Sequence, residues 1–480
     1  MNYLLELVRK TQKLNLLWFS GYALYLVFSY MVFHSATLLS SAGEIDHSAE
    51  VVFFATSLSA RVAMFIAIAC LVRQIMKIPS SILIAVTGGI AITGLLVTAM
   101  VFQFSAALPT DIYLPWLIVG GAFLGIADVM ITLVWARFSS TLTLRAVFLY
   151  VVICNAVSLA IYFIVTLLPL WMAIPVAGAL LLTSTFFGKK ALDVRPASGW
   201  EYSRPVFKSA ARRLAHPMVG ASILCFMAGI MLQISGQQDI SLEAFQHTAL
   251  LTSAIAILVL LLPALFMKKT LNIGRMYALA LPLSAAGFLL LPLIWNAAGG
   301  IVNSFAQLGA MVAGIILWCL LAETSHDTKL PSFLLFSIAL ACTNAAQLAG
   351  TLIGYFNADT LKQSDILMTA VALVAIYLLF MVALFLFKDK SLKGEEGLPE
   401  HNLEADEPDL RERCQAIAQV NHFTPRESEI FILLAQGYTI PAISEKLFVS
   451  ENTVKSHVKS IYQKLDVHAR TELIERVNTV

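Results

Sequence analysis

Long apolar segments alternate with short polar breaks along the chain as far as about residue 387. Because about twenty apolar residues cross the hydrocarbon core of a membrane as a helix, each such segment predicts a spanning helix. Twelve segments qualify, at approximately residues 14–40, 51–72, 81–104, 114–136, 145–167, 169–187, 217–236, 247–267, 275–295, 299–322, 331–356 and 365–387. The fifth and sixth are divided at Leu168 and Pro169.

The composition agrees with this pattern, since 59% of the 480 residues are hydrophobic and only 13% are charged. Soluble proteins carry about 25% charged residues, so the chain is predicted to be an integral membrane protein. Five of the six cysteines fall in apolar runs and no framework spacing is present, so neither a disulfide nor a metal site is indicated. The first apolar run lacks a small-residue cleavage site and is expected to stay as a spanning helix.

Basic residues mark alternate breaks between the spans, and acidic residues mark the breaks in between. The basic breaks hold Arg73, Lys77, Arg137, Arg145, Lys268, Lys269 and Arg275, and the others hold Glu44, Asp46, Glu50, Asp111, Asp239 and Glu243, with Lys362 as an exception. Lysine and arginine favour the cytoplasmic side, so both termini are predicted to be cytoplasmic. A long basic break, residues 188–216, divides the spans into halves at about 14–187 and 217–387.

The composition changes at Lys388, after the last apolar segment. Residues 388–420 are polar and carry the carboxylates Glu395, Glu396, Glu400, Glu404, Asp406, Glu407 and Asp409. High charge with little apolar content is typical of a solvated cytoplasmic linker, although Leu410–Val420 also fits a short connecting helix. We therefore expect a membrane domain over residues 1–387 and a separate small domain over residues 421–480.

Residues 423–465 carry the signals of successive short helices. Thr424, Pro425 and Glu427 form a Thr-x-x-Glu capping box with proline at the first helical position. A second short helix is expected to follow, and Ser450 can cap a third one. The third helix has one apolar stripe, made of Val454, Val458, Ile461 and Leu465.

The opposite face of the third helix is polar. It holds Asn452, Lys455, Ser456, Lys459 and Gln463. Two short helices joined by a tight turn, with lysines pointing outward from the second, is the arrangement that enters the DNA major groove. The periodicity alone is equally compatible with an ordinary amphipathic helix whose lysines are solvated.

The run FTPRESEIFILLAQGYTIPAISEKLFVSENTVKSHVKSIYQKLDVHARTELI resembles the LuxR-type helix-turn-helix domain over nearly its whole length. The matching positions are Thr424, Arg426, Glu427, Leu434, Gly437, Ile443, Leu447, Ser450, Thr453, Val454, Lys455, His457, Lys464, Leu465, Val467 and Arg470. The resemblance implies a four-helix domain that binds double-stranded DNA. It implies base contacts by Lys455, Ser456 and Lys459, and phosphate contacts by Ser450, Thr453, Tyr462 and Lys464. Glu427 and His457 are expected to be structural.

The small domain is electrically balanced, which limits its affinity for DNA. Its basic residues are Arg426, Lys446, Lys455, Lys459, Lys464, Arg470 and Arg476, and its acidic ones are Glu427, Glu429, Glu445, Glu451, Asp466, Glu472 and Glu475. Non-specific binding depends on phosphate neutralisation, so a single copy should bind weakly. We expect a homodimer on two half-sites, and the resemblance implies that Ala469–Val477 forms the dimer surface.

Two ionisable residues lie at membrane depth, where charges are costly and mark functional sites. Arg61 lies near the middle of the second span, and Asp128 lies in the fourth. They either form a structural ion pair, or Arg61 receives an anionic ligand that Asp128 orients. Amide side chains give a second set of candidates for a ligand cavity, namely Asn155, Gln233, Asn303, Gln307, Asn344 and Gln347. The alternative for each amide is a hydrogen bond that joins helices.

The layout of six plus six spans resembles the major facilitator superfamily. The loop between the second and third spans, CLVRQIMKIPSS, lacks the acidic and glycine positions of that family's signature, and FMKKTLNIGRMY keeps only Gly274 and Arg275. The predicted fold class is therefore all-α, with about twelve transmembrane helices in two halves and a C-terminal LuxR-type domain. The loss of the signature argues against transport.

The hypothesis that accounts for both domains is a one-component transcriptional regulator in the bacterial cell membrane. A small molecule bound by the membrane domain would change how the cytoplasmic domains bind DNA. The alternative is a major-facilitator-like transporter with a regulatory DNA-binding tail. No nucleotide-binding loop, metal cluster or activated nucleophile is apparent, so the sequence indicates neither an enzyme nor a cofactor.

Overall fold

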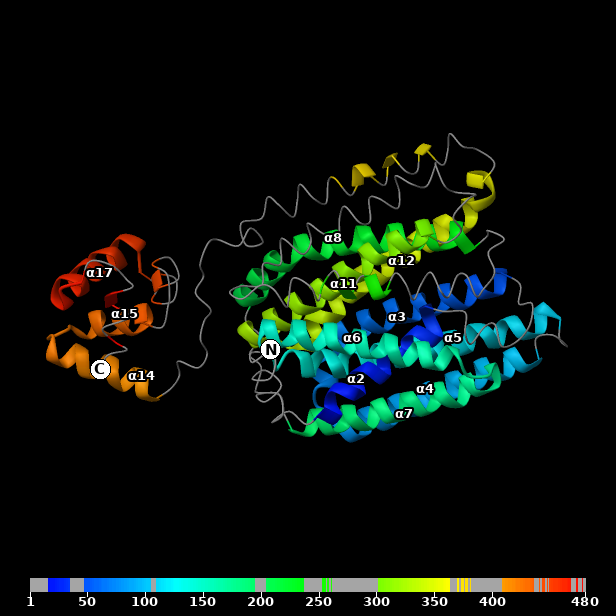
Figure 1. Ribbon diagram of the computed structural model, residues 1–480, viewed down its shortest axis with the longest axis horizontal. Helices are drawn as coiled ribbons and strands as arrows, with labels where there is room; N and C mark the ends of the chain where they lie inside the picture. The colour runs from blue at the N-terminus through cyan, green and yellow to red at the C-terminus, as the bar shows by residue number, and fades with distance from the viewer. Residues whose placement is uncertain are drawn as a thin grey trace. The chain divides into compact units, whose positions relative to one another are not determined.

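The computed structural model describes residues 16–34, 47–104, 109–194, 204–236, 301–362, 408–435 and 449–467, together with short pieces within 253–260, 369–380, 440–447 and 472–477. The chain forms two compact units, Met1–Leu392 and Lys393–Val480 (Figure 1). Each unit has its own buried core.

The first unit is built from long helices in its described part (Figure 1). They are α2 (Leu16–Ser29), the π-helix η1 (Tyr30–His34), α3 (His47–Ile75), α4 (Ser80–Phe104), α5 (Thr110–Ser139), α6 (Leu144–Thr166), α7 (Leu170–Val194), α8 (Arg204–Gly236), α11 (Ile301–Thr328) and α12 (Ser332–Lys362). Among the described residues, eight helices are long and apolar enough to cross a membrane. The first unit is thus a multi-pass membrane domain.

These eight helices, α3 to α8 with α11 and α12, match eight of the twelve predicted spans. The first predicted span coincides with α2 and η1, whose apolar part is the shorter segment Gly21–Phe33. The division at Leu168 and Pro169 is confirmed, since α6 ends at Thr166 and α7 begins at Leu170. Three predicted spans remain: 275–295 lies wholly outside the described residues, and 247–267 and 365–387 lie largely outside them.

The connection between the two halves is shorter than the predicted loop 188–216. Helix α7 continues to Val194, and α8 already begins at Arg204, well before Pro217. Lysine, arginine and alanine are good helix formers, so a helix can extend beyond the apolar segment that crosses the lipid. The two helices therefore extend beyond the apolar segments that the hydropathy pattern identified.

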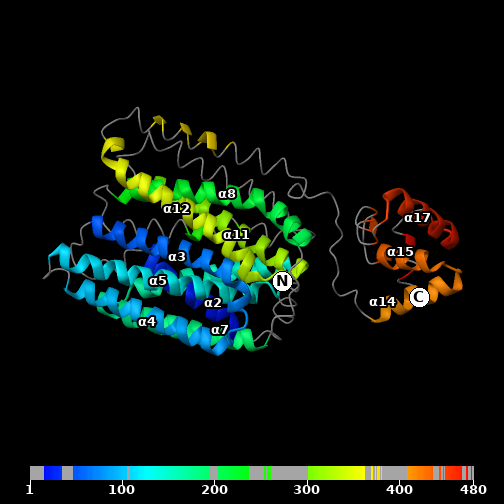
Figure 2. The ribbon, with the colours of Figure 1, turned by 180° about the vertical axis from the view of Figure 1, so that it is seen from behind.

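The helices of the membrane domain pack within each half and across the two halves (Figures 1 and 2). In the first half α3 and α4 pack against α5, and α2 packs against α6 and α7, while α8 packs against α11 and α12 in the second. The halves join where α12 contacts α3 and α11 contacts α6. Small residues allow the closest crossings: a Cβ at Gly125 would meet the Ser57 carbonyl, and one at Gly350 would meet the Phe226 carbonyl.

Aromatic side chains fill the region where the first half meets α11. Trp135 and Tyr150 are among the largest fully buried side chains, and Tyr22 contacts both of their rings. Tyr22 also stacks on Trp318 of α11 with 5.7 Å between ring centroids. The indole Nε1 of Trp318 donates a hydrogen bond to Ser139 Oγ at 3.1 Å. Aromatic packing thus links the two halves directly.

The second unit contains α14 (Pro408–Val420), α15 (Pro425–Ala435) and α17 (Glu451–Leu465) in its described part. Helix α14 lies within the segment predicted to be a linker. Its Cys414 and Ile417 are buried in one cluster with Ile430 and Phe431 of α15. These apolar positions lie three residues apart and therefore share a helix face. The interpretation of Leu410–Val420 as a short helix is confirmed, and this helix packs against α15.

Candidate nucleic-acid interface and buried ion pair

Helix α17 is held at both ends by local hydrogen bonds. Ser450 is its N-cap, and Ser450 Oγ accepts a hydrogen bond from the Thr453 backbone N–H at 3.2 Å. At the other end Asp466 is left-handed, with φ 54°, and donates its backbone N–H to the Tyr462 carbonyl. The predicted stripe Val454, Val458, Ile461 and Leu465 is buried. Burial of this stripe fixes which face of α17 points outward.

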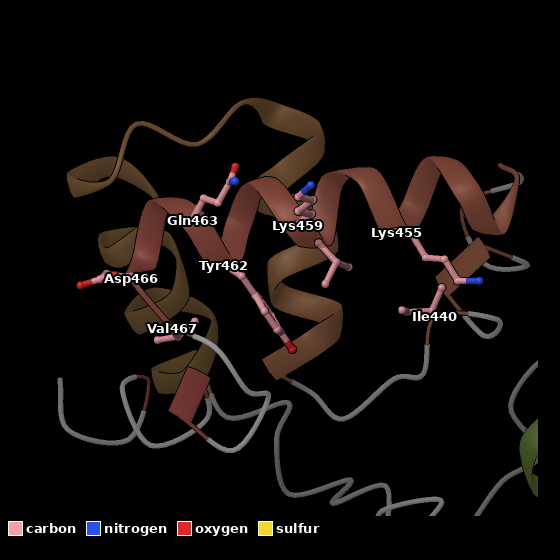
Figure 3. Close-up of a pocket in the computed structure, with 8 residues that line it drawn as sticks. Ile440, Lys455, Lys459, Tyr462, Gln463, Asp466 and Val467 are labelled. Atoms are coloured by element: carbon pink, nitrogen blue, oxygen red, sulfur yellow. The ribbon is translucent and has the colours of Figure 1, made fainter.

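The outward face of α17 lies along a groove of about 500 Å³ (Figure 3). The groove is lined by Ile440, Lys455, Val458, Lys459, Tyr462, Gln463, Asp466 and Val467. Lys455, Ser456 and Lys459, the three predicted base-contacting residues, are all exposed. The structure therefore brings two of these three residues together with Tyr462, a predicted phosphate contact, along one helix.

The remaining predicted phosphate contacts lie at opposite ends of α17. Ser450 and Thr453 meet at the N-terminus, where their hydroxyl oxygens are 2.8 Å apart. Lys464 lies at the C-terminal end, and its ammonium donates to Glu427 Oε2 at 2.7 Å and to the His422 carbonyl at 3.1 Å. Lys464 thus has a structural role that the sequence pattern did not suggest.

Glu427 is the centre of the network that joins α15 to α17. Its carboxylate accepts hydrogen bonds from the Thr424 backbone N–H at 2.8 Å and from Ser460 Oγ at 2.6 Å, besides the one from Lys464. The Glu427 N–H is in turn 3.2 Å from Thr424 Oγ1, which completes the predicted capping box. Burial raises the pKa of Glu427, but the hydrogen bonds that its carboxylate accepts outweigh this effect and lower the pKa to about 2.

The basic side chains of α15 and α17 differ in how far neighbouring carboxylates neutralise them. Arg426 is 2.7 Å from Glu429, and Lys455 Nζ is 3.8 Å from Glu451 Oε2. Lys459 has no ion pair within 4 Å to any residue that the structure describes. Lys455 and Lys459 are therefore the cations of α17 that are most available to a nucleic acid.

Gln463 and Ile440 line the groove and were not predicted as site residues. Gln463 belongs to the polar face that the helical spacing predicted; it lies four residues after Lys459 and is exposed. Ile440 comes from the segment before α17, and only the packing of the unit brings it to the groove. An amide one turn from Lys459 adds a donor and an acceptor that can bond to base edges.

In the membrane domain, the structure pairs Arg61 of α3 with Asp128 of α5. Arg61 Nε is 3.1 Å from Asp128 Oδ2, and the two side chains are 12% and 7% exposed. Tyr25 of α2 donates its hydroxyl to Asp128 Oδ1 at 2.6 Å and is 2.7 Å from Thr132 Oγ1. The guanidinium lies over the ring of Phe33 at 3.9 Å. Helices α2, α3 and α5 thus hold one buried charged cluster.

Phe33 belongs to η1, the π-helical turn that follows α2. Such turns are rare and occur frequently at functional sites. The hydropathy pattern gave no sign of it, because hydropathy does not distinguish an α-helical turn from a π-helical one.

The amide candidates do not all behave alike. Asn155 and Asn344 bond to carbonyls one turn earlier in their own helices, and Gln307 bonds to the Ala228 carbonyl of α8 at 3.1 Å. Gln233 is only 3% exposed, and its Oε1 has no hydrogen-bond partner within the described part of the chain. Gln347 is half-buried on α12, and the side chain of Asn303 lies outside the described residues.

Residues 421–477 match the family described as bacterial regulatory proteins, luxR family. The segment is 45% identical over 51 residues to the transcriptional regulatory protein DegU of Brevibacillus brevis, covering 11% of this chain and 22% of DegU. It is 43% identical over 60 residues to the nitrate/nitrite response regulator protein NarL of Escherichia coli K12, covering 12% of this chain and 28% of NarL. The chain thus spans less than a third of these relatives.

The membrane domain is similar in fold to solved transporters. A bacterial homologue of the iron transporter ferroportin, in an outward-facing state, aligns with a TM-score of 0.54 and 10% identity over 78% of this chain and 97% of that one. The human organic anion transporter MFSD10 (TETRAN) aligns with a TM-score of 0.54 and 15% identity over 77% and 98%. At these identities the likeness concerns the fold. The chain therefore combines a membrane domain that shares the fold of these transporters with a C-terminal segment that matches the luxR family.

Proposed function

We propose that this chain is a membrane-bound, one-component transcriptional regulator. The observation that carries the proposal is the exposed lysine face of α17, with its groove, on the same chain as a multi-pass membrane domain. In this proposal both termini lie in the cytoplasm of a bacterial cell, and a small molecule bound by the membrane domain is the signal.

At the DNA, Lys455, Ser456 and Lys459 contact base edges in the major groove. Lysine donates to guanine acceptors, and the small Ser456 lets the helix approach closely. Ser450, Thr453, Tyr462 and Lys464 hold the phosphate backbone on either side. These roles are supported by the exposure of the first three residues and by the position of the others along α17.

The DNA-binding unit acts as a homodimer in this proposal. Its seven basic and seven acidic side chains leave little net charge, so one copy neutralises few phosphates. Two copies on adjacent half-sites add their contacts, and the second copy then binds at a high effective concentration. A membrane domain that changes the pairing of the two copies can therefore control promoter occupancy.

The decisive experiment compares promoter occupancy in cells for the full-length protein and for Lys455→Ala/Lys459→Ala. Chromatin pull-down should recover specific promoters with the wild type and only background with the double variant, while membrane fractionation stays unchanged. The matched control is Lys208→Ala/Arg212→Ala, which removes two exposed cations from α8 instead. Equal occupancy by the wild type and the double lysine variant would exclude the regulator.

A transport assay separates this proposal from the transporter alternative. Each half of the membrane domain lacks the complete loop signature of the transporter family, so we expect no concentrative uptake into proteoliposomes. Uptake that survives the double lysine substitution would instead identify a transporter.

A further inference from the structure

In the buried cluster around Arg61, the carboxylate of Asp128 has more of its hydrogen-bonding capacity used than the guanidinium of Arg61. Asp128 uses Oδ1 to accept from Tyr25 and faces Arg61 with Oδ2. By contrast, Arg61 Nη2 is buried and makes no hydrogen bond within the part of the chain that the structure describes, and Nε faces Asp128 Oδ2 at 3.1 Å without an aligned hydrogen bond. A guanidinium presents five N–H donors in a fork that matches a carboxylate in two parallel bonds. The fork of Arg61 therefore has donors left for an acceptor.

Leaving these donors unused is costly at membrane depth. A buried donor without an acceptor loses its hydration and gains nothing in return. The face of the guanidinium is covered by Phe33, so an acceptor must approach in the plane of the fork. The Nε and Nη2 atoms are themselves buried, so an acceptor reaches them by displacing Asp128 from the guanidinium.

We propose that Arg61 binds the carboxylate of an organic acid with an apolar body, and that Asp128 is the internal competitor for the same guanidinium. This inference rests on the proposed function, because it names the class of signal that the membrane domain receives. Asp128 already neutralises Arg61, so a singly charged acid adds one net charge to the cluster and a phosphate dianion adds two. The lower charge favours a carboxylate in a site surrounded by Phe33 and Tyr25.

Tyr25 connects this site to the second half of the membrane domain. Its hydroxyl is shared between Asp128 and Thr132, so a shift of Asp128 changes a hydrogen bond of Tyr25. The Tyr25 ring stacks on Tyr22 at 6.2 Å, and Tyr22 stacks on Trp318 of α11 at 5.7 Å. The acid that displaces Asp128 thus moves aromatic side chains at the contact between the halves.

Binding is tested on the full-length protein in lipid nanodiscs, with benzoate as the probe and benzamide as its neutral counterpart. Isothermal titration calorimetry should show that benzoate binds to the wild type and that benzamide does not. Asp128→Asn removes the competitor and should lower the Kd for benzoate about tenfold, within the usual range of couplings between sites. Arg61→Gln should abolish binding, and Arg61→Lys, which keeps the charge and loses the fork, should bind weakly.

Arg213→Gln is the matched control, because Arg213 pairs with Glu323 at 2.7 Å elsewhere in the domain. It should bind benzoate like the wild type. The inference is overturned if Arg61→Gln binds benzoate as the wild type does, if Asp128→Asn gains nothing, or if neither the wild type nor Asp128→Asn binds it. Size-exclusion profiles establish whether each variant is folded. If Arg61→Gln is not folded, the affinity of Arg61→Lys for benzoate tests the role of the guanidinium instead.

The connection through Tyr25 has its own readout. Benzoate should change the tryptophan fluorescence of the wild type, and the change should disappear in Trp318→Phe. Tyr25→Phe should still bind benzoate but should lose most of the fluorescence change. A full fluorescence change in Tyr25→Phe contradicts the connection.

Failure of this inference differs from failure of the proposed function. If benzoate binds through Arg61 but the protein occupies no promoter, only the proposed function as a transcriptional regulator is excluded. Promoter occupancy that depends on Lys455 and Lys459, with benzoate binding independent of Arg61, excludes only the acid site.

Discussion

Two ion pairs, one in each unit, join helices that are distant in the sequence, and they are completed to different degrees. Glu427 and Lys464 lie 2.7 Å apart, and the carboxylate also accepts bonds from a hydroxyl and a backbone N–H. Arg61 and Asp128 lie 3.1 Å apart, with guanidinium donors left unbonded among the described residues. The Glu427–Lys464 pair therefore has a structural role, whereas the Arg61–Asp128 pair retains donors that can bind a ligand.

The difference follows from the surroundings of each pair. Lys464 is one third exposed, so water supplies any hydrogen bond that the protein does not. Arg61 is buried among membrane helices, where the chain itself must supply every acceptor. An incomplete pair at that depth persists only if another requirement offsets its cost, and ligand binding is such a requirement.

The largest effect is expected from breaking the membrane pair on one side. Arg61→Ala leaves the carboxylate of Asp128 buried without its cation and should destabilise the membrane domain by about 3–5 kcal/mol. Arg61→Met/Asp128→Leu removes both charges and should recover most of that loss while abolishing any response to an acid. Thermal unfolding of the detergent-solubilised protein measures both variants, and equal stability of Arg61→Ala and the wild type would show that the pair is not formed.

A somewhat smaller effect is expected from acidification of the second pair. The pKa of Glu427 is about 2, below its ordinary value of 4.5, so the carboxylate stabilises the fold fully above about pH 4.5. This contribution, roughly 3 kcal/mol at 1.36 kcal/mol for each pKa unit, should be lost as the pH falls toward 2. Urea unfolding of residues 393–480 at several pH values measures it.

Glu427→Gln should flatten that pH dependence, because the amide does not titrate in this range. Glu429→Gln is the matched control, since Glu429 is exposed and its ion pair with Arg426 is exposed too. A pH dependence that Glu427→Gln leaves intact would assign the effect to other carboxylates.

A local effect of about 1 kcal/mol is expected from the cap of α17. Ser450→Ala removes the acceptor for the Thr453 N–H and should lower the stability of the second unit by that amount. Ser450→Asp keeps an acceptor and should retain stability, although its charge should weaken DNA binding. Urea unfolding and DNA titration separate the two consequences.

The smallest effect concerns the salt dependence of DNA binding. Lys459→Gln should reduce the slope of log K against log salt by about 0.9, as expected for one phosphate contact or its electrostatic equivalent. Lys464→Gln should reduce it by less, because Glu427 already neutralises its ammonium. Fluorescence anisotropy with a promoter fragment at several salt concentrations measures both slopes, and equal reductions would give Lys464 a full share in phosphate binding.

Much of the fold could be predicted because it rests on regular spacing. Apolar length identified the spans that the structure describes, and four-residue and three-residue spacing identified the buried stripe of α17. The capping box at Thr424 and Glu427 was readable because both partners lie within one helical turn. The exposed lysines followed from the same periodicity, since burying one face of a helix turns the other outward.

The sequence by itself determined that membrane helices precede a helix-turn-helix domain, because hydropathy is a local property and residues 423–474 carry the residue pattern of that family. Only the tertiary structure decided that Arg61 pairs with Asp128, that Tyr25 donates a hydrogen bond to the same carboxylate, and that Lys464 pairs with Glu427. Each of these contacts joins residues 37 to 103 positions apart. Packing of several helices sets such contacts, and no spacing along one helix encodes them.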